Sequence, residues 1–234
     1  MEKWTTTKIG NYEITHKVGA NPQLLLTAHL SDPIQIIGDH PVVHEKKLGR
    51  EHFAFRAMDK FAAKNYHAPE ILFNDLRAFD KMKLKEFEEP VALIKDSKKP
   101  YIHTVVTKWK KGSVNLDTYL RDKKIPLQRK IKMCKTAMTA LARFDKTGYF
   151  HSHISAENFV VLPKDKAHLI DYSLILPKSA EMQERESVMA AVSLSGVLFA
   201  IHSNFTGTSE ITYKLLDHYN RMINTPKRIP KEVK

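Results

Sequence analysis

The sequence predicts an α+β fold, in which a small antiparallel sheet with one helix precedes a mainly helical region. Short bursts of alternating apolar and polar residues fill the first part of the chain, separated by Gly, Asn, Asp and Pro, as is typical of strands. The longest helical patterns come later, and no internal repeat divides the chain. We therefore expect a single domain over residues 1–234, with an N-terminal lobe over about 1–107 and a C-terminal lobe over about 112–234.

The first lobe should contain several short strands and one helix. Alternation predicts strands over residues 12–17, 23–30 and 33–37. A helix is expected over 49–64, because Phe53, Ala57 and Phe61 recur at helical spacing.

A hairpin should close this lobe, and helices should make up the next one. Segments rich in Val, Ile and Thr flank a turn-forming sequence, which predicts a hairpin over residues 90–95 and 101–109. The strongest helical pattern runs over 126–147, with proline near its start and Gly148 as its stop. Further helices are expected over 113–123, 182–202 and 211–223, and two very short strands over 159–162 and 168–170.

Composition limits where the protein works and what it binds. No stretch approaches the roughly 18 to 20 apolar residues that span a bilayer, and the start lacks the apolar segment of a secretory signal, so we expect no membrane span and a cytoplasmic location. The single cysteine, Cys134, lies in an apolar-periodic stretch and is expected to be buried in a reducing compartment. The formal charge of +12 favours anionic partners such as nucleic acid or acidic lipid headgroups, although a solvated basic face explains it as well.

The residues that carry chemistry lie in GYFHSHISAENFVVL and the following AHLIDYSLI. These segments resemble the catalytic loop and metal-binding motif of protein kinases, whose pattern is His-x-Asp-x-x-x-x-Asn followed by Asp-Phe-Gly. His151, Asn158 and Asp171 fall on this pattern. The resemblance implies a two-lobed protein-kinase-like fold, and the short C-terminal lobe is similar to small bacterial lipopolysaccharide-core kinases and RIO-like kinases.

The resemblance implies a site for ATP and Mg²⁺ in which one catalytic group is replaced. The amide oxygen of Asn158 and the carboxylate of Asp171 are hard oxygen ligands that suit magnesium. In an active kinase the loop aspartate accepts the proton of the substrate hydroxyl, but this chain has His153 at that position. A bound polyanion favours the charged form of histidine, which is a poor base.

Other parts of the kinase pattern are also eroded. The phosphate-covering loop should be rich in glycine, but KVGANPQ offers only Gly19. The lysine that holds the phosphates belongs on a strand before the helix that bears its glutamate partner, for which Glu51 is the candidate. One alignment puts His44 at the lysine position, and a shift of two residues puts Lys46 there on the same strand face, which we favour.

Three further sets of residues bear on the site. VALIK superficially matches the kinase lysine motif, but Lys95 comes after the expected helix and is set aside. The connection between the lobes should place backbone groups of Thr107, Lys108 and Trp109 near an adenine ring, although an edge strand explains this segment equally well. This region also contains three histidines, His151, His153 and His168. No thiolate or carboxylate accompanies them at the spacing that zinc ligands require, so a zinc site is not expected.

The sequence therefore favours a regulatory or scaffolding pseudokinase that retains binding of magnesium and ATP. Two alternatives stay open: an active atypical kinase that phosphorylates a glycolipid, sugar or protein hydroxyl, and a basic binding module for nucleic acid or an anionic surface.

Overall fold

The chain divides into two compact units. A computed structural model describes residues 4–31, 36–37, 40–41, 43–57, 89–98, 103–151, 154–170, 176–177, 179–201 and 208–224. Unit 1 comprises Met1–Ser113 with Ile170–Ile175, and unit 2 comprises Val114–Leu169 with Leu176–Lys234. None of the described helices has both the length and the apolar character needed to cross a bilayer.

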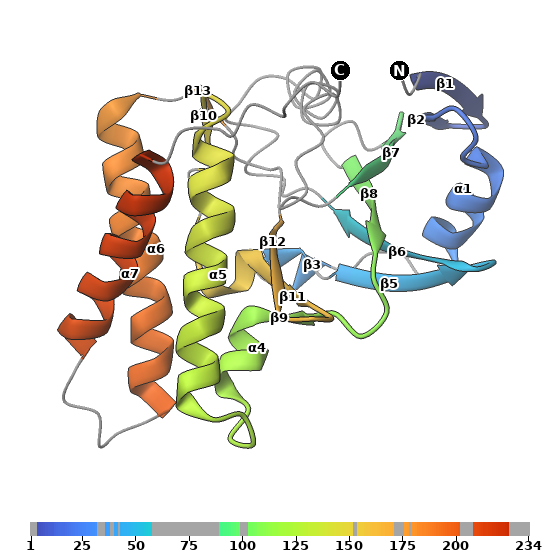
Figure 1. Cartoon of the computed structure of the whole chain (residues 1–234). Coiled ribbons are helices and arrows are strands. Elements are labelled where there is room, and N and C mark those ends of the chain that lie inside the picture. Colours follow the sequence, from blue (N-terminus) through green and yellow to red (C-terminus); the bar gives the residue numbers. More distant parts are fainter. Residues whose placement is uncertain are drawn as a thin grey trace, which may run out of the picture. The chain divides into compact units, whose positions relative to one another are not determined.

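Unit 1 is built on a six-stranded antiparallel sheet (Figure 1). Its strands lie in the order β1-β2-β7-β8-β6-β5, so chain order and spatial order differ. The bounds are β1 Trp4–Ile9, β2 Tyr12–Lys17, β5 Val43–Leu48, β6 Glu51–Ala57, β7 Pro90–Asp96 and β8 His103–Trp109. A short separate pair is formed by β3 Ile36–Ile37 and β4 His40–Pro41.

The core of unit 1 lies between one face of this sheet and helix α1, Pro22–Leu30. Ile14 on β2 lies opposite Ile94 on β7, and Phe55 on β6 lies opposite Val106 on β8. These four side chains belong to one buried cluster with Leu25 and other residues of α1. The predicted hairpin of β7 and β8 is confirmed, and both of its strands are central in the sheet.

The predicted helix over residues 49–64 is wrong where the structure describes it, because Glu51–Ala57 form strand β6. Residues 58–64 lie outside the described residues. Phe53 and Phe55 point to the same face of a strand, and Ala54 on the other face is fully buried as well. A strand that is buried on both faces has no clean alternation, so spacing alone favoured a helix.

The predicted strand over residues 23–30 is also wrong, because this segment is helix α1. Asn21 caps its start, and its side chain accepts a hydrogen bond from the backbone N–H of Leu24 at 3.1 Å. Pro22 occupies the first turn, where no backbone donor is needed. These start signals, which come before a short apolar run, identify the helix.

Unit 2 holds a layer of helices and two small strand groups. Helices α5, α6 and α7 pack against one another, and α6 and α7 lie on the same side of α5 in Figure 1. The helices are α4 Leu116–Arg121, α5 Leu127–Asp145, α6 Ala180–Ile201 and α7 Thr208–Asn224, with the 3₁₀ turn η1 Ala156–Asn158. The strands are β9 Val114–Asn115, β10 Tyr149–Phe150, β11 Phe159–Leu162, β12 Lys166–Leu169 and β13 Leu176–Pro177.

The helices predicted for this unit are confirmed, with ends shifted by a few residues. Helix α5 presents Cys134 and Met138 to the core, and both are fully buried. Burial raises the pKa of the Cys134 thiol to about 12, so it stays protonated. The strands at 159–162 and 166–169 pair with each other, close to the predicted positions.

Candidate functional site

The segment that resembles a catalytic loop follows β10 in unit 2 and ends at η1. His151 at its start is fully buried, and Asn158 at its end is 8% exposed. His153, the residue at the catalytic position, and Asp171, the second expected metal ligand, lie outside the described residues. The structure therefore shows how the two ends of the loop are held.

The start of the loop is held by helix α6. The backbone N–H of His151 donates a hydrogen bond to Oε2 of Glu186 at 3.2 Å, and Glu186 is 5% exposed. The His151 ring meets the ring of Phe144 edge-on, with centroids 6.1 Å apart. Glu186 was not predicted as a site residue. The only sign of its role in the sequence is that an acidic residue directly precedes the apolar part of a helix.

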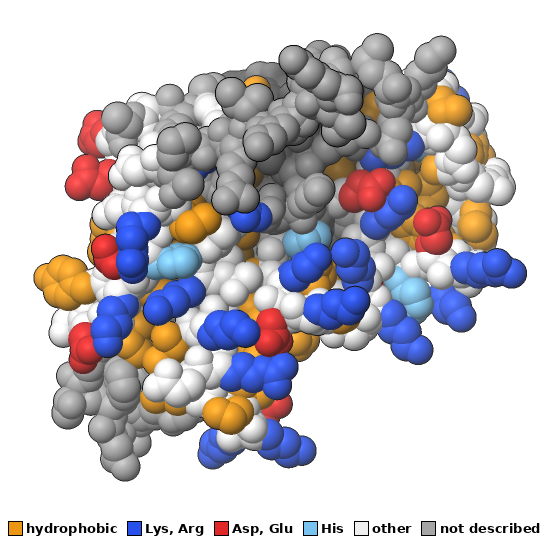
Figure 2. All heavy atoms as spheres, viewed as in Figure 1, with side chains coloured by type: hydrophobic (Ala, Val, Ile, Leu, Met, Phe, Trp, Pro, Cys, Tyr) orange, Lys and Arg blue, Asp and Glu red, His pale blue; other side chains and the backbone are white. Residues whose placement is uncertain are grey.

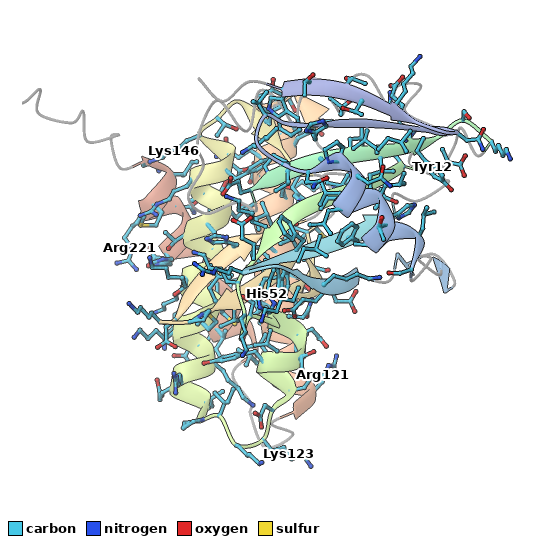
Figure 3. The ribbon with its side chains drawn as sticks, turned by 90° about the vertical axis from the view of Figure 1, so that its right-hand side faces the viewer. Tyr12, His52, Arg121, Lys123, Lys146 and Arg221 are labelled. Atoms are coloured by element: carbon cyan, nitrogen blue, oxygen red, sulfur yellow. The ribbon has the colours of Figure 1, made fainter. Side chains whose placement is uncertain are left out.

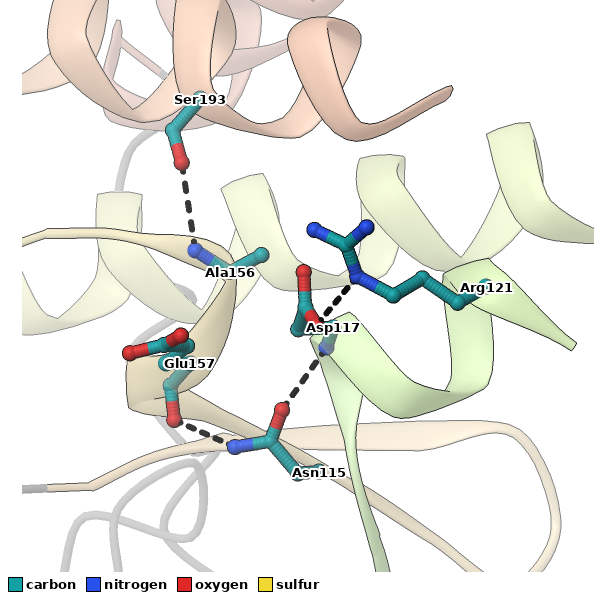
Figure 4. Close-up of polar contacts among 6 residues, drawn as sticks. All are labelled: Asn115, Asp117, Arg121, Ala156, Glu157 and Ser193. Carbon is teal, nitrogen blue, oxygen red and sulfur yellow. Dashed lines mark hydrogen bonds and ion pairs between the residues drawn. The ribbon is translucent and has the colours of Figure 1, made fainter. Parts of the chain in front are cut away.

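The end of the loop is held by α6 and by the segment before α4 (Figure 4). The backbone N–H of Ala156 donates to Oγ of Ser193 on α6 at 3.3 Å. The side chain of Asn115 donates to the carbonyl of Glu157 at 2.6 Å and accepts from the backbone N–H of Asp117 at 2.8 Å. Asn115 thus caps α4 and fixes the backbone beside Asn158 with one amide group.

Helix α4 is short, and one ion pair braces it. Nε of Arg121 lies 2.7 Å from Oδ2 of Asp117 one turn earlier (Figure 4). Together these contacts hold the backbone on both sides of Asn158, whose own N–H donates to the carbonyl of Ser155 at 3.2 Å. An amide side chain within a 3₁₀ turn whose backbone is held in this way could supply one oxygen ligand to a hard cation.

Lys46, the predicted phosphate contact, lies on the edge strand β5 of unit 1. Its Nζ donates to the carbonyl of Ala28 at 2.6 Å and to Oγ of Ser31 at 2.9 Å. Both acceptors belong to the last turn and C-cap of α1, where a cation satisfies free carbonyls and the helix dipole. This geometry gives Lys46 a structural role at the end of α1. The side chain of His44, the alternative, lies outside what the structure describes.

Glu51, the predicted partner of that lysine, opens strand β6 instead of lying on a helix. Its Oε1 is 3.9 Å from Nζ of Lys108, which is also 3.3 Å from Oε1 of Glu89. Thr107, Lys108 and Trp109 form the end of β8, and the backbone N–H of Lys108 donates to the carbonyl of Glu89 at 2.8 Å. The segment that was predicted to connect the lobes therefore belongs to β8, an inner strand of the sheet, as far as Trp109.

The position of Lys95 after the helix expected over residues 49–64 counts against it as the phosphate contact. The described part of that segment, residues 51–57, forms a strand instead. Counted across the sheet, β7 is the third strand, directly beside β2. Nζ of Lys95 lies 3.7 Å from Oε1 of Glu13 on β2, and Lys95 lies opposite His103 on β8. The Lys95 side chain is 28% exposed.

His103 is buried beside this lysine. Burial, and to a smaller extent the charge of Lys95, lower the pKa of His103 to about 4. Neither of its ring nitrogens has a hydrogen-bond partner in the described part of the chain.

The glycine expected over the phosphates lies in a turn. Gly19 has a φ of +99° between β2 and α1, and β1 and β2 are joined by only Gly10 and Asn11. A connection this short does not wrap a triphosphate. His168, the remaining histidine of the loop region, lies on β12 opposite Val160.

No family model matches the chain, and no curated protein matches it. Among solved structures, the chain is similar to a divergent kinase lacking the glycine-rich loop, described as a regulator of membrane ultrastructure of the Toxoplasma parasitophorous vacuole. The TM-score is 0.57 at 12% identity, over 86% of this chain and 82% of that chain. The chain therefore has a protein-kinase-like fold, as the sequence predicted. Kinship with lipopolysaccharide-core or RIO-like kinases stays a prediction.

Proposed function

We propose that the protein is a regulatory or scaffolding pseudokinase that binds magnesium and a nucleotide without transferring phosphate efficiently. The observation that carries the proposal is His153 at the position of the kinase proton acceptor, in a chain with a kinase-like fold. Imidazole beside a polyanion gains charge and loses its capacity to accept a proton. The β1–β2 turn supports the same conclusion, since Gly10 and Asn11 alone are too short a connection to cover the phosphates.

The proposed nucleotide site keeps two metal ligands. Asn158 supplies an amide oxygen from a backbone that Asn115 and Ser193 hold in place, and Asp171 supplies a carboxylate. Both are ligands that Mg²⁺ prefers. Bound magnesium would neutralise phosphate charge, and these side chains would orient it.

The lysine of this site is proposed to be Lys95, with Lys46 as the alternative. The amine of Lys46 is held at the end of α1, whereas Lys95 ends VALIK, which matches the kinase lysine motif in sequence and lies on an inner strand of the sheet. Lys95 also has an acidic neighbour in Glu13, at 3.7 Å.

Thermal unfolding with and without Mg²⁺ and ATP tests the proposal. A ligand at 100 times its dissociation constant adds about 2.7 kcal/mol, or roughly 5–10 °C in Tm for a chain of this length. We expect this shift in the wild type and its loss in Asp171→Ala. Phosphate transfer at about 1 s⁻¹ or faster, the ordinary kinase range, would overturn the pseudokinase assignment and favour the active alternative.

Two lysine variants separate the candidates for the phosphate contact. Lys95→Met is expected to abolish the nucleotide-induced rise in Tm. Lys46→Met is expected to lower the Tm of the free protein, because α1 loses its C-terminal cation, while the nucleotide-induced rise is kept. The reverse pattern would assign the phosphate contact to Lys46.

A second candidate function is the binding of nucleic acid, and the exposed cations of unit 2 favour it. Figure 2 shows Lys and Arg side chains spread over this face with few carboxylates between them. Arg129 and Lys132 on α5 share one carboxylate, Asp165, at 3.0 and 3.9 Å. Arg121 and Lys123 extend the basic surface at α4 and its following turn (Figure 3).

Salt dependence tests this second candidate. For a protein that neutralises several phosphates, the logarithm of the binding constant falls linearly with the logarithm of the salt concentration. We expect fluorescence anisotropy with a labelled RNA to give a steep negative slope, which Arg129→Gln with Lys132→Gln makes shallower. Binding that is absent, or indifferent to salt, would remove this function.

A further inference from the structure

Helix α6 carries an apolar stripe that the chain leaves exposed. Its members recur at helical spacing along one side of the helix, and they are Met182, Val188, Met189, Val192, Gly196 and Phe199. The exposed fraction of the side chain is 40% for Met182, 39% for Val188, 56% for Met189, 50% for Val192 and 47% for Phe199. No charged residue occurs between residues 187 and 201. Exposed apolar surface this continuous marks an interaction site in a water-soluble domain.

Gly196, in the middle of the stripe, gives a second and independent observation. A Cβ atom at this position would meet nothing within 4 Å in the chain. Glycine inside a helix costs about 1 kcal/mol relative to alanine, and among the described residues no close contact requires it. A notch without a side chain lets another helix approach closely. The shape of the stripe therefore points to a helix as its occupant.

We propose that the occupant is the α6 helix of a second copy of this chain, packed antiparallel about a two-fold axis near Leu194. In this register residues whose numbers sum to 388 face each other. Val192 of each copy then enters the Gly196 notch of the other, as a knob enters a hole. Met189 meets Phe199, a favourable sulfur–aromatic contact. The part of the stripe from Met189 to Phe199 is thus complementary to itself.

The area of the stripe and the charges on α6 itself fit the centre of such an interface. The five large side chains present on the order of 400 Å², the size of a patch that is often functional. A standard interface buries about 800 Å² on each partner, so the stripe forms its apolar centre and its polar neighbours form the rim. The charged residues of α6 all lie in its first seven positions, away from the notch, and they are Glu181, Glu184, Arg185 and the buried Glu186. No like charges meet at the centre.

The net charge makes the salt dependence diagnostic. Each copy carries +12, so two copies repel each other at low ionic strength. Salt screens this repulsion without weakening the apolar contact. We expect the dimer to become tighter as NaCl rises, which is opposite to the behaviour of a nucleic-acid complex.

Sedimentation of the full chain over a range of concentrations tests the dimer. We expect a reversible monomer–dimer equilibrium, which Met189→Lys weakens by at least about tenfold, or about 1.4 kcal/mol. Tyr213→Lys is the matched control, because Tyr213 is a large side chain 72% exposed on α7, outside the stripe. It should leave the equilibrium unchanged. Equal weakening by both changes, or a wild-type monomer at every concentration, would overturn the proposal.

Gly196→Leu separates a specific helix pair from general stickiness. The added side chain fills the notch and should weaken the dimer, although it makes the stripe more apolar. Its Cβ atom meets nothing within 4 Å among the described residues, and leucine has a higher helix propensity than glycine, so the Tm of the monomer should rise. Stronger self-association in Gly196→Leu would contradict the proposed packing. This inference does not depend on nucleotide binding, and Asp171→Ala should leave the dimer intact.

Discussion

Glu186 is a charged residue inside unit 2 that holds the backbone of the candidate loop. Its carboxylate accepts a hydrogen bond from the N–H of His151, and both residues are buried. A buried carboxylate is retained only where donors satisfy it, because desolvation is costly. The loop and the helix are therefore mutually dependent.

Replacing Glu186 should destabilise the protein. Glu186→Ala leaves the buried N–H of His151 without this acceptor, and the expected cost is about 1–3 kcal/mol. Glu186→Gln keeps an acceptor oxygen and should cost less. Urea unfolding measures both, with the exposed Glu184→Ala as the control. Equal stability of Glu186→Ala and Glu184→Ala would show that the contact contributes nothing.

His103 should make stability depend on pH. Its pKa of about 4 in the folded state lies below the ordinary value of 6.5, so the unfolded chain binds more protons between these values. The free energy of unfolding should fall as pH drops from about 6.5 to about 4. His103→Leu loses no hydrogen bond within the described residues and should flatten this slope. An unchanged slope in chemical denaturation would assign the pH dependence to other groups.

At the scale of elements, helix α1 shows how a short helix is fixed at both ends. Asn21 satisfies a backbone N–H at its start, and Lys46 reaches a carbonyl at its end from a strand that comes later in the chain. A helix of nine residues is too short to persist alone in water. Its stability therefore comes from these caps and from its contact with the sheet.

Removing the N-cap should lower stability by a modest, measurable amount. Asn21→Ala is expected to cost about 1 kcal/mol, and Asn21→Ser should retain most of the stability because a hydroxyl oxygen accepts the same hydrogen bond. Thermal unfolding of the three proteins gives the comparison. A loss as large in Asn21→Ser as in Asn21→Ala would mean that the cap hydrogen bond is not the cause.

The long elements could be read from the sequence, whereas the partners of single side chains could not. Helix α5 combines a wide apolar stripe with a glycine stop, and periodicity alone identifies it. Strand β6 is buried on both faces, so no alternation marked it, and the helix pattern was misleading. Lys46 lies on a strand, β5, but its contact with α1 depends on tertiary packing, which the sequence pattern does not show. The anchors Glu186 and Ser193 are distant in sequence from the loop that they hold.

At the scale of the whole molecule, the charge of +12 acts on stability as well as on binding. Like charges repel in the compact state more than in the expanded unfolded chain, and salt screens this repulsion. The Tm should therefore rise by a few degrees between about 20 and 300 mM NaCl. Lys123→Glu, at an exposed turn, should reduce the rise slightly. A Tm that falls over this range would show that favourable ion pairs outweigh the net repulsion.

The burial of Cys134 has a practical consequence for spectroscopy. The only thiol of the chain is fully buried and, with a pKa near 12, unreactive towards maleimides at neutral pH. A second cysteine placed at an exposed position, such as Lys123→Cys or Tyr213→Cys, can therefore take a dye or spin label without removal of the native one. Two such cysteines in one chain, at positions 123 and 213, carry a pair of labels and make the distance between the turn after α4 and helix α7 measurable in solution.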